Sequence, residues 1–275
     1  MYEFTYRKSE SIIEAASMFN ASEDARYLAG GMTLLPTMKQ RLAAPEILID
    51  LNGINSLRGI EKHDDVIVIG ALTTHAQVAA SALVQNNIPA LAELASVIGD
   101  PQVRNRGTLG GSVANSDPAA DYPAALLGLN ATIQTNRRSI AADEFFIDIF
   151  ETALEDDELI TTVSFPIPDR AAYCKFPNPA SGYATVGVFV VCNRPGTSQQ
   201  DVRVAVTGAA GCVFREESME AALRSNFSVD SLADIEIDAD EFNEDIHASA
   251  SYRAHLVGVM ARRAVQSITA DKSRS

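Results

Sequence analysis

A glycine-rich segment at residues 98–121 constrains more than any other feature what this chain can fold into. It reads IGDPQVRNRGTLGGSVANSDPAAD and combines small residues, a pair of arginines and several glycines. Such glycines can adopt positive φ or let a ligand approach the main chain, and neighbouring hydroxyl groups add donors beside the exposed N–H groups. The pattern predicts a loop that binds an anion such as a phosphate. The residues concerned are Gly107, Thr108, Gly110, Gly111 and Ser112.

A second glycine pair lies earlier, within residues 29–34. The pair follows the apolar dipeptide Tyr27-Leu28 and precedes residues 35–42, an order that indicates a strand, a tight turn and the start of a helix. Main-chain N–H groups and the helix dipole both favour an anion at such a turn. One turn of this kind is more often a plain connector, but two together indicate two phosphates, or one diphosphate held from both sides. The candidate residues of this loop are Ala29, Gly30, Gly31, Met32, Thr33 and Leu34.

Neither loop matches a standard nucleotide-binding template. The first predicted strand is not followed by G-x-G-x-x-G, and G-x-x-x-x-G-K-[ST] occurs nowhere in the chain. The sequence therefore disfavours a Rossmann dinucleotide fold and a P-loop NTPase. A bound diphosphate would have to be held in another way.

The two loops, with Thr73-Thr74-His75 between them, resemble the FAD-binding medium subunit of the molybdenum hydroxylases. This family includes aerobic carbon monoxide dehydrogenase and the flavin region of xanthine dehydrogenase. The resemblance covers nearly the whole chain. It includes residues 2–4, 69–78, 98–121, 157–166 and 245–253.

The fold implied by this resemblance is α+β with two parts. Residues 1–168 would form a two-subdomain α/β FAD-binding domain of the vanillyl-alcohol-oxidase/PCMH type, and residues 169–275 a smaller α+β domain with a short antiparallel sheet and helices. A chain of 275 residues exceeds the usual single-domain size of about 100–150 residues, which agrees with two domains. Pro166 and Pro168 would end the preceding strand and mark the boundary.

Hydrophobic patterns predict individual elements in both parts. Ser11 and Glu14 fit a capping box that opens a first helix, and Asp117-Pro118 fits the start of another helix that continues to about residue 129. A third helix is expected at residues 88–98 and a fourth at 252–268. Strands are expected at residues 46–51, 66–69, 131–134, 183–191 and 202–206.

Composition excludes several classes of protein. The formal net charge is −14, which argues against a nucleic-acid-binding protein. No apolar export signal or run of the roughly 20 residues that cross a bilayer is present, so we expect a cytoplasmic protein without a membrane span. Cys174, Cys192 and Cys212 lack the spacing of an iron–sulfur site or a disulfide framework, and the scattered histidines suggest no metal site.

Further cofactor-binding residues follow from the resemblance alone. Taken from the residues themselves, His75 would be structural, Asp121 a first-turn helix carboxylate, Ile160 core, and Lys175 an exposed loop lysine. The resemblance instead places Asp121, Ile160 and Lys175 near the flavin, where a cation would stabilise the reduced form. Many relatives have Arg or Asp where this chain has Gly182, which leaves the local charge there open. The full set added by the resemblance is Thr74, His75, Asn115, Asp121, Ile160, Lys175 and Tyr183.

The function implied by the resemblance is electron transfer by an oxidoreductase subunit. FAD in this chain would pass electrons from two-iron two-sulfur clusters of a small partner subunit to an external acceptor. A large partner would carry the molybdenum–pterin centre, and the complex would be a dimer of heterotrimers. No catalytic acid, base or metal ligand is then needed in this chain. Two alternatives remain: a free-standing FAD-dependent reductase or oxidase of the same fold, and an interaction subunit that has lost its flavin.

Overall fold

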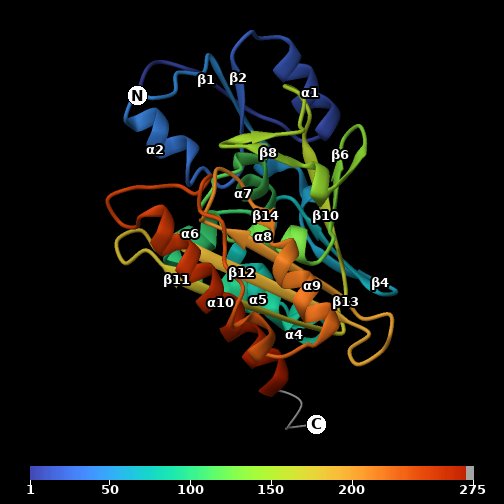
Figure 1. Ribbon diagram of the computed structural model, residues 1–275. Coiled ribbons are helices and arrows are strands. Elements are labelled where there is room, and N and C mark those ends of the chain that lie inside the picture. Colours follow the sequence, from blue (N-terminus) through green and yellow to red (C-terminus); the bar gives the residue numbers. More distant parts are fainter. Residues whose placement is uncertain (271–275) are drawn as a thin grey trace.

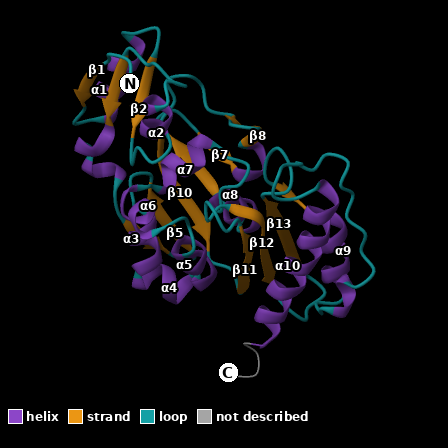
Figure 2. Ribbon diagram, turned by 90° about the vertical axis from the view of Figure 1, so that its left-hand side faces the viewer, coloured by secondary structure: helices purple, strands orange, loops and turns teal. Residues whose placement is uncertain are grey.

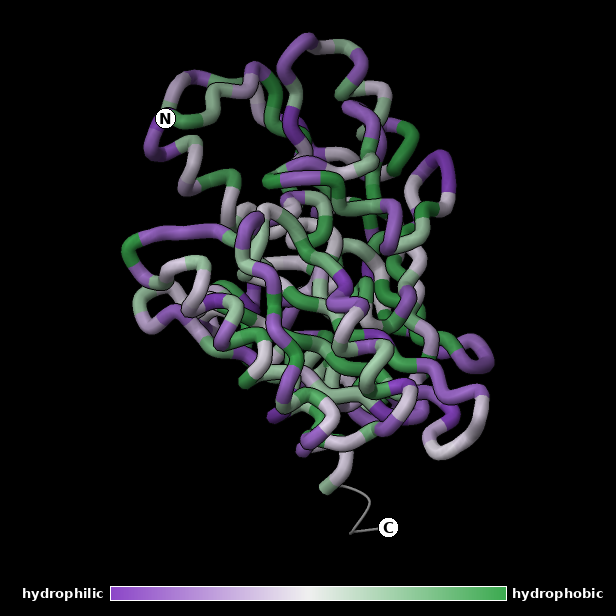
Figure 3. Tube along the Cα trace, in the orientation of Figure 1, coloured by the Kyte–Doolittle hydropathy of each residue, from purple (hydrophilic) through white to green (hydrophobic). Residues whose placement is uncertain are grey.

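Three sheets of three or more strands succeed one another from the N-terminal to the C-terminal end of the molecule (Figure 1). The computed structural model describes residues 1–270. Helices and strands are mixed throughout, so the predicted α+β class is confirmed. Polar segments gather in the peripheral loops, and apolar segments run through the interior (Figure 3).

The N-terminal sheet contains three parallel strands in the order β1-β3-β2. The predicted N-cap is confirmed, because the Ser11 hydroxyl accepts from the N–H of Glu14 at 3.2 Å. The predicted return bond is not formed, since the Glu14 carboxylate accepts from the N–H of Glu10 instead. The elements are β1 (Thr5–Lys8), α1 (Ile12–Asn20), β2 (Ala25–Leu28), α2 (Leu34–Lys39), β3 (Ile47–Asp50), η1 (Leu51–Gly53) and η2 (Asn55–Leu57).

The central sheet has the order β4-β5-β10-β6-β7 and is antiparallel. Strand β10 comes from much later in the chain and inserts between β5 and β6, which places residue 160 beside the helices that connect those two strands. The strands are β4 (Ile60–His63), β5 (Val66–Gly70), β6 (Thr132–Thr135), β7 (Ser139–Ala141) and β10 (Ile160–Pro166), with a small hairpin of β8 (Phe146–Asp148) and β9 (Glu151–Thr152) after η3 (Ala142–Glu144). The connecting helices are α3 (His75–Ala80), α4 (Ala82–Asn87), α5 (Pro89–Ser96), α6 (Pro101–Arg106), α7 (Leu109–Asn115) and α8 (Tyr122–Gly128).

The C-terminal sheet is antiparallel and buried on both faces. Along β12, Phe189 and Val191 pack into the central core, whereas Val188 and Val190 pack against α10. Helices α9 and α10 cover the outer face (Figure 2). Burial on both faces explains the uninterrupted apolar run of residues 186–192 in β12. The elements are β11 (Arg170–Pro177), β12 (Ala184–Asn193), β13 (Asp201–Thr207), β14 (Phe214–Arg215), α9 (Glu217–Ser225), η4 (Asp230–Leu232) and α10 (Ala250–Ala270).

The predicted helix start at Asp117-Pro118 is wrong. Helix α8 begins at Tyr122, and the Asp117 carboxylate instead accepts from the N–H of Ala119 in a turn. The reason is tertiary: Gly208 donates to the carbonyl of Pro118, Ala184 to that of residue 119, and the Thr207 hydroxyl to that of residue 120. Strands β12 and β13 thus use the carbonyl groups that a longer helix would need. Across residues 1–270, no helix has the length and apolarity to span a membrane.

Candidate cofactor cavity

A cavity of about 510 Å³ lies between the N-terminal sheet, the central helices and the loop that joins β11 to β12. Its wall contains both glycine loops. All the residues predicted to bind the cofactor line it except Thr74 and Lys175. The predicted residues at the wall are Ala29, Gly30, Gly31, Met32, Thr33, Leu34, His75, Thr108, Gly110, Gly111, Ser112, Asn115, Asp121, Ile160 and Tyr183.

The two glycine loops touch each other through their main chains. A Cβ atom on Gly30 would lie 2.1 Å from the carbonyl oxygen of Arg106 and 2.9 Å from the Cα of Gly107. Any side chain at residue 30 would therefore force the loops apart. The fold thus joins two segments that are distant in sequence into one wall.

The first loop presents main-chain donors to the cavity. Gly31 has φ +74°, a conformation that glycine adopts at little cost, and this turn leads into α2. Thr33, at the N-cap of α2, makes no side-chain cap bond. Within residues 1–270, the N–H groups of Met32 and Thr33 have no hydrogen-bond partner, so they can bind an anion as the sequence predicts.

The second loop differs from the prediction in two respects. None of Gly107, Gly110 and Gly111 has positive φ, and the main-chain N–H groups of residues 109–112 are already used. The N–H of Gly110 donates to the carbonyl of Ala71 at 2.8 Å, and that of Gly111 to the Thr108 hydroxyl at 3.2 Å. Leu109 and Ser112 donate to the carbonyls of Thr73 and Thr108. The glycines instead permit close packing, since a Cβ on Gly110 would lie 2.5 Å from the Cβ of Ala71.

Side chains rather than main-chain groups are the available donors in the second loop. The Ser112 hydroxyl and the Asn115 amide line the cavity, and neither is hydrogen-bonded to another described residue. Both lie on α7, one turn apart, on the side of the helix that faces the cavity. The anion-binding capacity of this loop therefore resides in these two residues.

His75 is a neutral part of the wall. Its side chain packs against Gly107, because a Cβ added to Gly107 would lie 2.6 Å from His75 Nε2. Burial, and secondarily the charge of Arg104, lowers the pKa of His75 to about 4. The imidazole is therefore uncharged at neutral pH. Thr74 lies outside the wall and forms a capping box with Gln77 that starts α3.

Asp121, which lines the wall, forms an ion pair with Lys175, which lies behind it. The Asp121 carboxylate accepts from the Tyr173 hydroxyl at 2.5 Å and from Lys175 Nζ at 2.9 Å. Lys175 also donates to the carbonyl of Val97, and its side chain is buried. The lysine is thus neither an exposed loop residue nor a free cation beside the cavity.

Ile160 and Tyr183 lie on different parts of the wall. Ile160 is buried at the start of β10, whereas Tyr183 is half-exposed at the rim. Burial raises the pKa of Tyr183, and the charges of Asp117 and Asp121 raise it further. The fields of these carboxylates therefore extend into the cavity. Gly182, beside Tyr183, has φ +74° and packs against Gly99. Because glycine has no side chain, this position adds no charge to the cavity.

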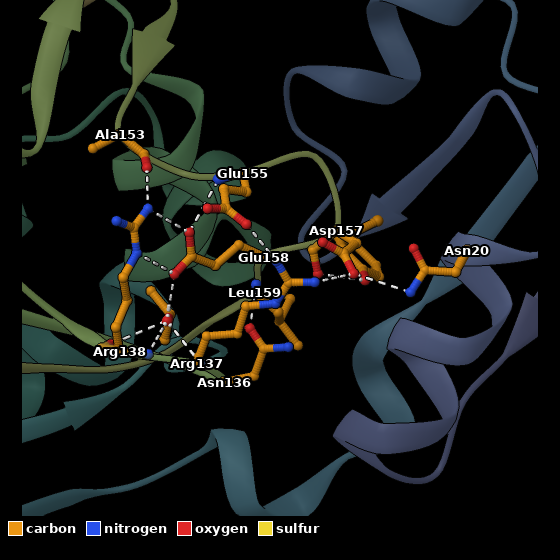
Figure 4. Close-up of polar contacts among 11 residues, drawn as sticks. Asn20, Asn136, Arg137, Arg138, Ala153, Glu155, Asp157, Glu158 and Leu159 are labelled. Atoms are coloured by element: carbon orange, nitrogen blue, oxygen red, sulfur yellow. Dashed lines mark hydrogen bonds and ion pairs between the residues drawn. The ribbon is translucent and has the colours of Figure 1, made fainter.

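The loop before β10 is a wall segment that the sequence analysis did not single out as a site. Glu158 is its centre: the carboxylate accepts from Arg138 Nε and Nη2, both at 3.0 Å, and from the Thr135 hydroxyl at 2.7 Å (Figure 4). No sequence pattern signals these contacts, because Arg138 and Glu158 meet only through the β6–β7 turn. Further wall residues absent from the prediction include Leu72, Ile98, Gly99, Val103, Asp117, Leu154, Glu158 and Leu159.

The same loop is bonded to the N-terminal part of the chain. Arg137 pairs with Glu155 and with Asp157, and the Asp157 carboxylate accepts from Asn20 Nδ2 at 3.0 Å (Figure 4). The Tyr27 hydroxyl donates to the carbonyl of Asp157 at 3.2 Å. The charged cluster therefore connects this part of the cavity wall to α1, to β2 and to the β6–β7 turn.

We expect Glu158→Gln to destabilise the protein more at neutral pH than in acid. Hydrogen bonds from Arg138 hold the pKa of Glu158 at about 2, below its ordinary value of 4.5. Because the pKa is lower in the folded state, the carboxylate stabilises the fold above pH 4.5, and this contribution is lost as the pH falls towards 2. The shift corresponds to roughly 3 kcal/mol. Urea unfolding of both proteins between pH 7 and pH 3 measures this difference.

The matched control is Glu155→Gln, because Glu155 pairs with Arg137 but is largely exposed. Exposed pairs contribute little, so this variant should stay close to the wild type at every pH. An unfolding difference for Glu158→Gln that is the same at pH 7 and pH 3 would contradict the prediction.

Two family models together match almost the entire chain. One, described as the FAD binding domain in molybdopterin dehydrogenase, matches residues 2–168, and the other, the CO dehydrogenase flavoprotein C-terminal domain, matches residues 171–268. The chain belongs to this family. The predicted relationship is thus confirmed, and with it an FAD-binding subunit of the molybdenum hydroxylase family. Among residues 1–270, no group of three or more His, Cys, Asp or Glu residues could hold a metal ion.

The similarity to relatives named as medium chains or medium subunits extends over nearly the whole of each chain. The chain is 36% identical to the carbon monoxide dehydrogenase medium chain of Hydrogenophaga pseudoflava, over 95% of this chain and 96% of that one. It is also 36% identical to the nicotine 6-hydroxylase medium subunit of Paenarthrobacter nicotinovorans, over 94% and 95%. The solved carbon monoxide dehydrogenase of H. pseudoflava superposes with a TM-score of 0.87 at 35% identity, covering 98% of each chain. Quinoline 2-oxidoreductase of Pseudomonas putida 86 gives 0.83 at 26% identity, covering 97% of each chain. This medium subunit is therefore part of an oxidoreductase.

Proposed function

We propose that the chain binds FAD in this cavity and passes electrons from two-iron two-sulfur clusters of a partner subunit to an external acceptor. The observation that carries the proposal is the main-chain contact of the two glycine loops at Gly30 and Arg106, which forms one wall with donors on both sides. When bound, FAD supplies the capacity to accept electrons from one centre and release them to another. The residues of this chain then need only to bind and position it.

The cavity residues fit the chemistry of a dinucleotide. The N–H groups of Met32 and Thr33 would bind one side of the diphosphate, and the side chains of Ser112 and Asn115 the other. The remaining wall is largely apolar and includes Ile160, which suits the face of a flavin. The contacts of individual residues with FAD stay predictions.

The partners follow from the family. Relatives carry names such as medium chain and medium subunit, which supports a small iron–sulfur subunit and a large molybdenum–pterin subunit as partners. We propose a dimer of heterotrimers in the cytoplasm. The division of the chain at residues 168 and 169 also stays a prediction, and residues 271–275 of the second domain lie outside the described residues.

The absorption spectrum of the purified chain is the direct test of FAD binding. We expect a flavin spectrum, with about one FAD released per chain on heating. A colourless chain that takes up no added FAD would support a subunit without flavin.

A second experiment tests the electron donor. We expect rapid reduction of bound FAD when the small and large partners and the substrate of the large subunit are added together. The chain alone should not turn over with simple donors. Multiple turnovers without partners would contradict the proposal in favour of a free-standing reductase or oxidase.

A further inference from the structure

The ion pair at the cavity wall joins three separate segments of the fold. Asp121 precedes α8, Lys175 lies on β11, and the Val97 carbonyl that also accepts from Lys175 ends α5. Tyr173, two residues before Lys175 on the same strand, donates to the other carboxylate oxygen of Asp121. Each oxygen of the carboxylate thus has its own donor from one strand.

This cluster is almost completely removed from solvent. The side chain of Asp121 is 3% exposed and that of Lys175 is 6% exposed. Removing water strengthens the interaction of each charge with its surroundings, so either charge left alone would act strongly on a group in the cavity. As a pair, their fields largely cancel beyond the immediate contact.

Asp121 brings one member of the cluster to the cavity, because it lines the wall. Burial and the charge of Asp117 raise the pKa of Tyr183 at the rim, and the charge of Asp121 also contributes. Other titratable groups at the wall include Asp117, Tyr183 and the neutral His75. Hence the balance between Asp121 and Lys175 contributes, together with Asp117, to the net charge that this side of the cavity presents.

We propose that Tyr173 and Lys175 hold Asp121 as a charge-compensated carboxylate, and that this compensation sets the reduction potential of the bound flavin. The inference rests on the proposed FAD site. Negative charge builds on a flavin as it is reduced, so a lone cation nearby raises the potential and a compensated pair leaves it lower. Lys175 and Tyr173 are positioning residues, because they act through Asp121.

The test is the midpoint potential of FAD bound to the wild-type chain and to two variants. In Asp121→Asn the lysine loses its counter-charge, and we expect the potential to rise by at least the equivalent of a tenfold change in the two-electron equilibrium, about 30 mV. In the double variant Asp121→Asn/Lys175→Met both charges are absent, and the potential should return towards the wild-type value. A purely structural role would not produce this return.

The control is Glu220→Gln, which breaks another buried ion pair, with Arg215 and Arg224, away from the cavity. This variant should lose stability but keep the wild-type potential. An Asp121→Asn chain that retains FAD with an unchanged potential would overturn the inference. So would a double variant whose potential stays as high as that of Asp121→Asn. A wild-type chain without FAD would instead overturn the proposed function, so the two failures are distinct.

Discussion

Gly111→Val is expected to abolish FAD retention while leaving the fold largely intact. Gly111 is an exposed residue of α7 that lines the cavity. A Cβ added to Gly111 would lie 3.7 Å from the Cβ of Ala29 in the other loop. The valine side chain would therefore fill the space between the two glycine loops. Its Cβ would also lie 2.8 Å from the Thr108 Oγ1 that caps α7, so we expect a stability loss of about 1 kcal/mol. FAD content and thermal unfolding of the purified variant measure the two effects.

Gly110→Ala is the matched control. The sequence alone suggests that Gly110 and Gly111 are equivalent, with valine at either position removing FAD from an intact fold. The structure separates them, because a Cβ on Gly110 would collide with Ala71 in the core. We therefore expect Gly110→Ala to lose stability by about 1–3 kcal/mol, the usual cost of overpacking. Stoichiometric FAD in Gly111→Val would show that the flavin lies elsewhere.

Local sequence patterns predict the elements whose conformation depends mainly on neighbouring residues. The run at residues 186–192 is apolar without interruption, and it forms a strand because both faces of its sheet are covered. The turn at Gly30-Gly31 between an apolar dipeptide and a helix was also predicted, because only glycine adopts φ +74° readily. In both cases neighbouring residues determine the conformation.

Contacts between distant segments could not be predicted in this way. The N–H groups at residues 109 and 110 look available in the sequence, yet the carbonyls of Thr73 and Ala71 bind them. Lys175 looks like a free cation, yet Asp121 neutralises it across the fold. Each error has one cause: the partner comes from another strand or helix, and no local pattern records which elements become neighbours.

In the candidate site too, local residue types could be predicted from the sequence, whereas contacts between distant segments could not. Each loop contains residue types that are suited to a diphosphate, and the sequence shows them. The sequence does not show the strand order that brings Glu158 and Ile160 to the cavity, because β10 inserts between two earlier strands. The resemblance to a family supplied Ile160 where periodicity indicated only a core residue. Glu158 had no such signal, because its role depends on Arg138 from the facing turn.

Gly30→Ala should have the other large effect, because residue 30 is where the two halves of the wall meet. An added Cβ would lie 2.1 Å from the Arg106 carbonyl oxygen and 2.8 Å from its carbon. Both atoms belong to the main chain, so no side-chain rotation relieves the collision and the loops must separate. Donors on opposite sides of the cavity would then no longer reach one diphosphate. We expect FAD affinity to fall at least about tenfold, or 1.4 kcal/mol, measured by flavin fluorescence on titrating the apoprotein.

Gly53→Ala distinguishes this effect from general destabilisation. A Cβ on Gly53 would lie 2.3 Å from the carbonyl oxygen of Ser9, a similar collision within the N-terminal part of the chain but outside the cavity wall. Both variants should therefore unfold at lower temperature, whereas only Gly30→Ala should lose FAD affinity. Equal losses of affinity would mean that the cavity responds to any strain in the N-terminal sheet. A loss confined to residue 30 would identify the contact between the loops as the feature that binds the cofactor, because the two variants differ mainly in where the main chain is forced apart.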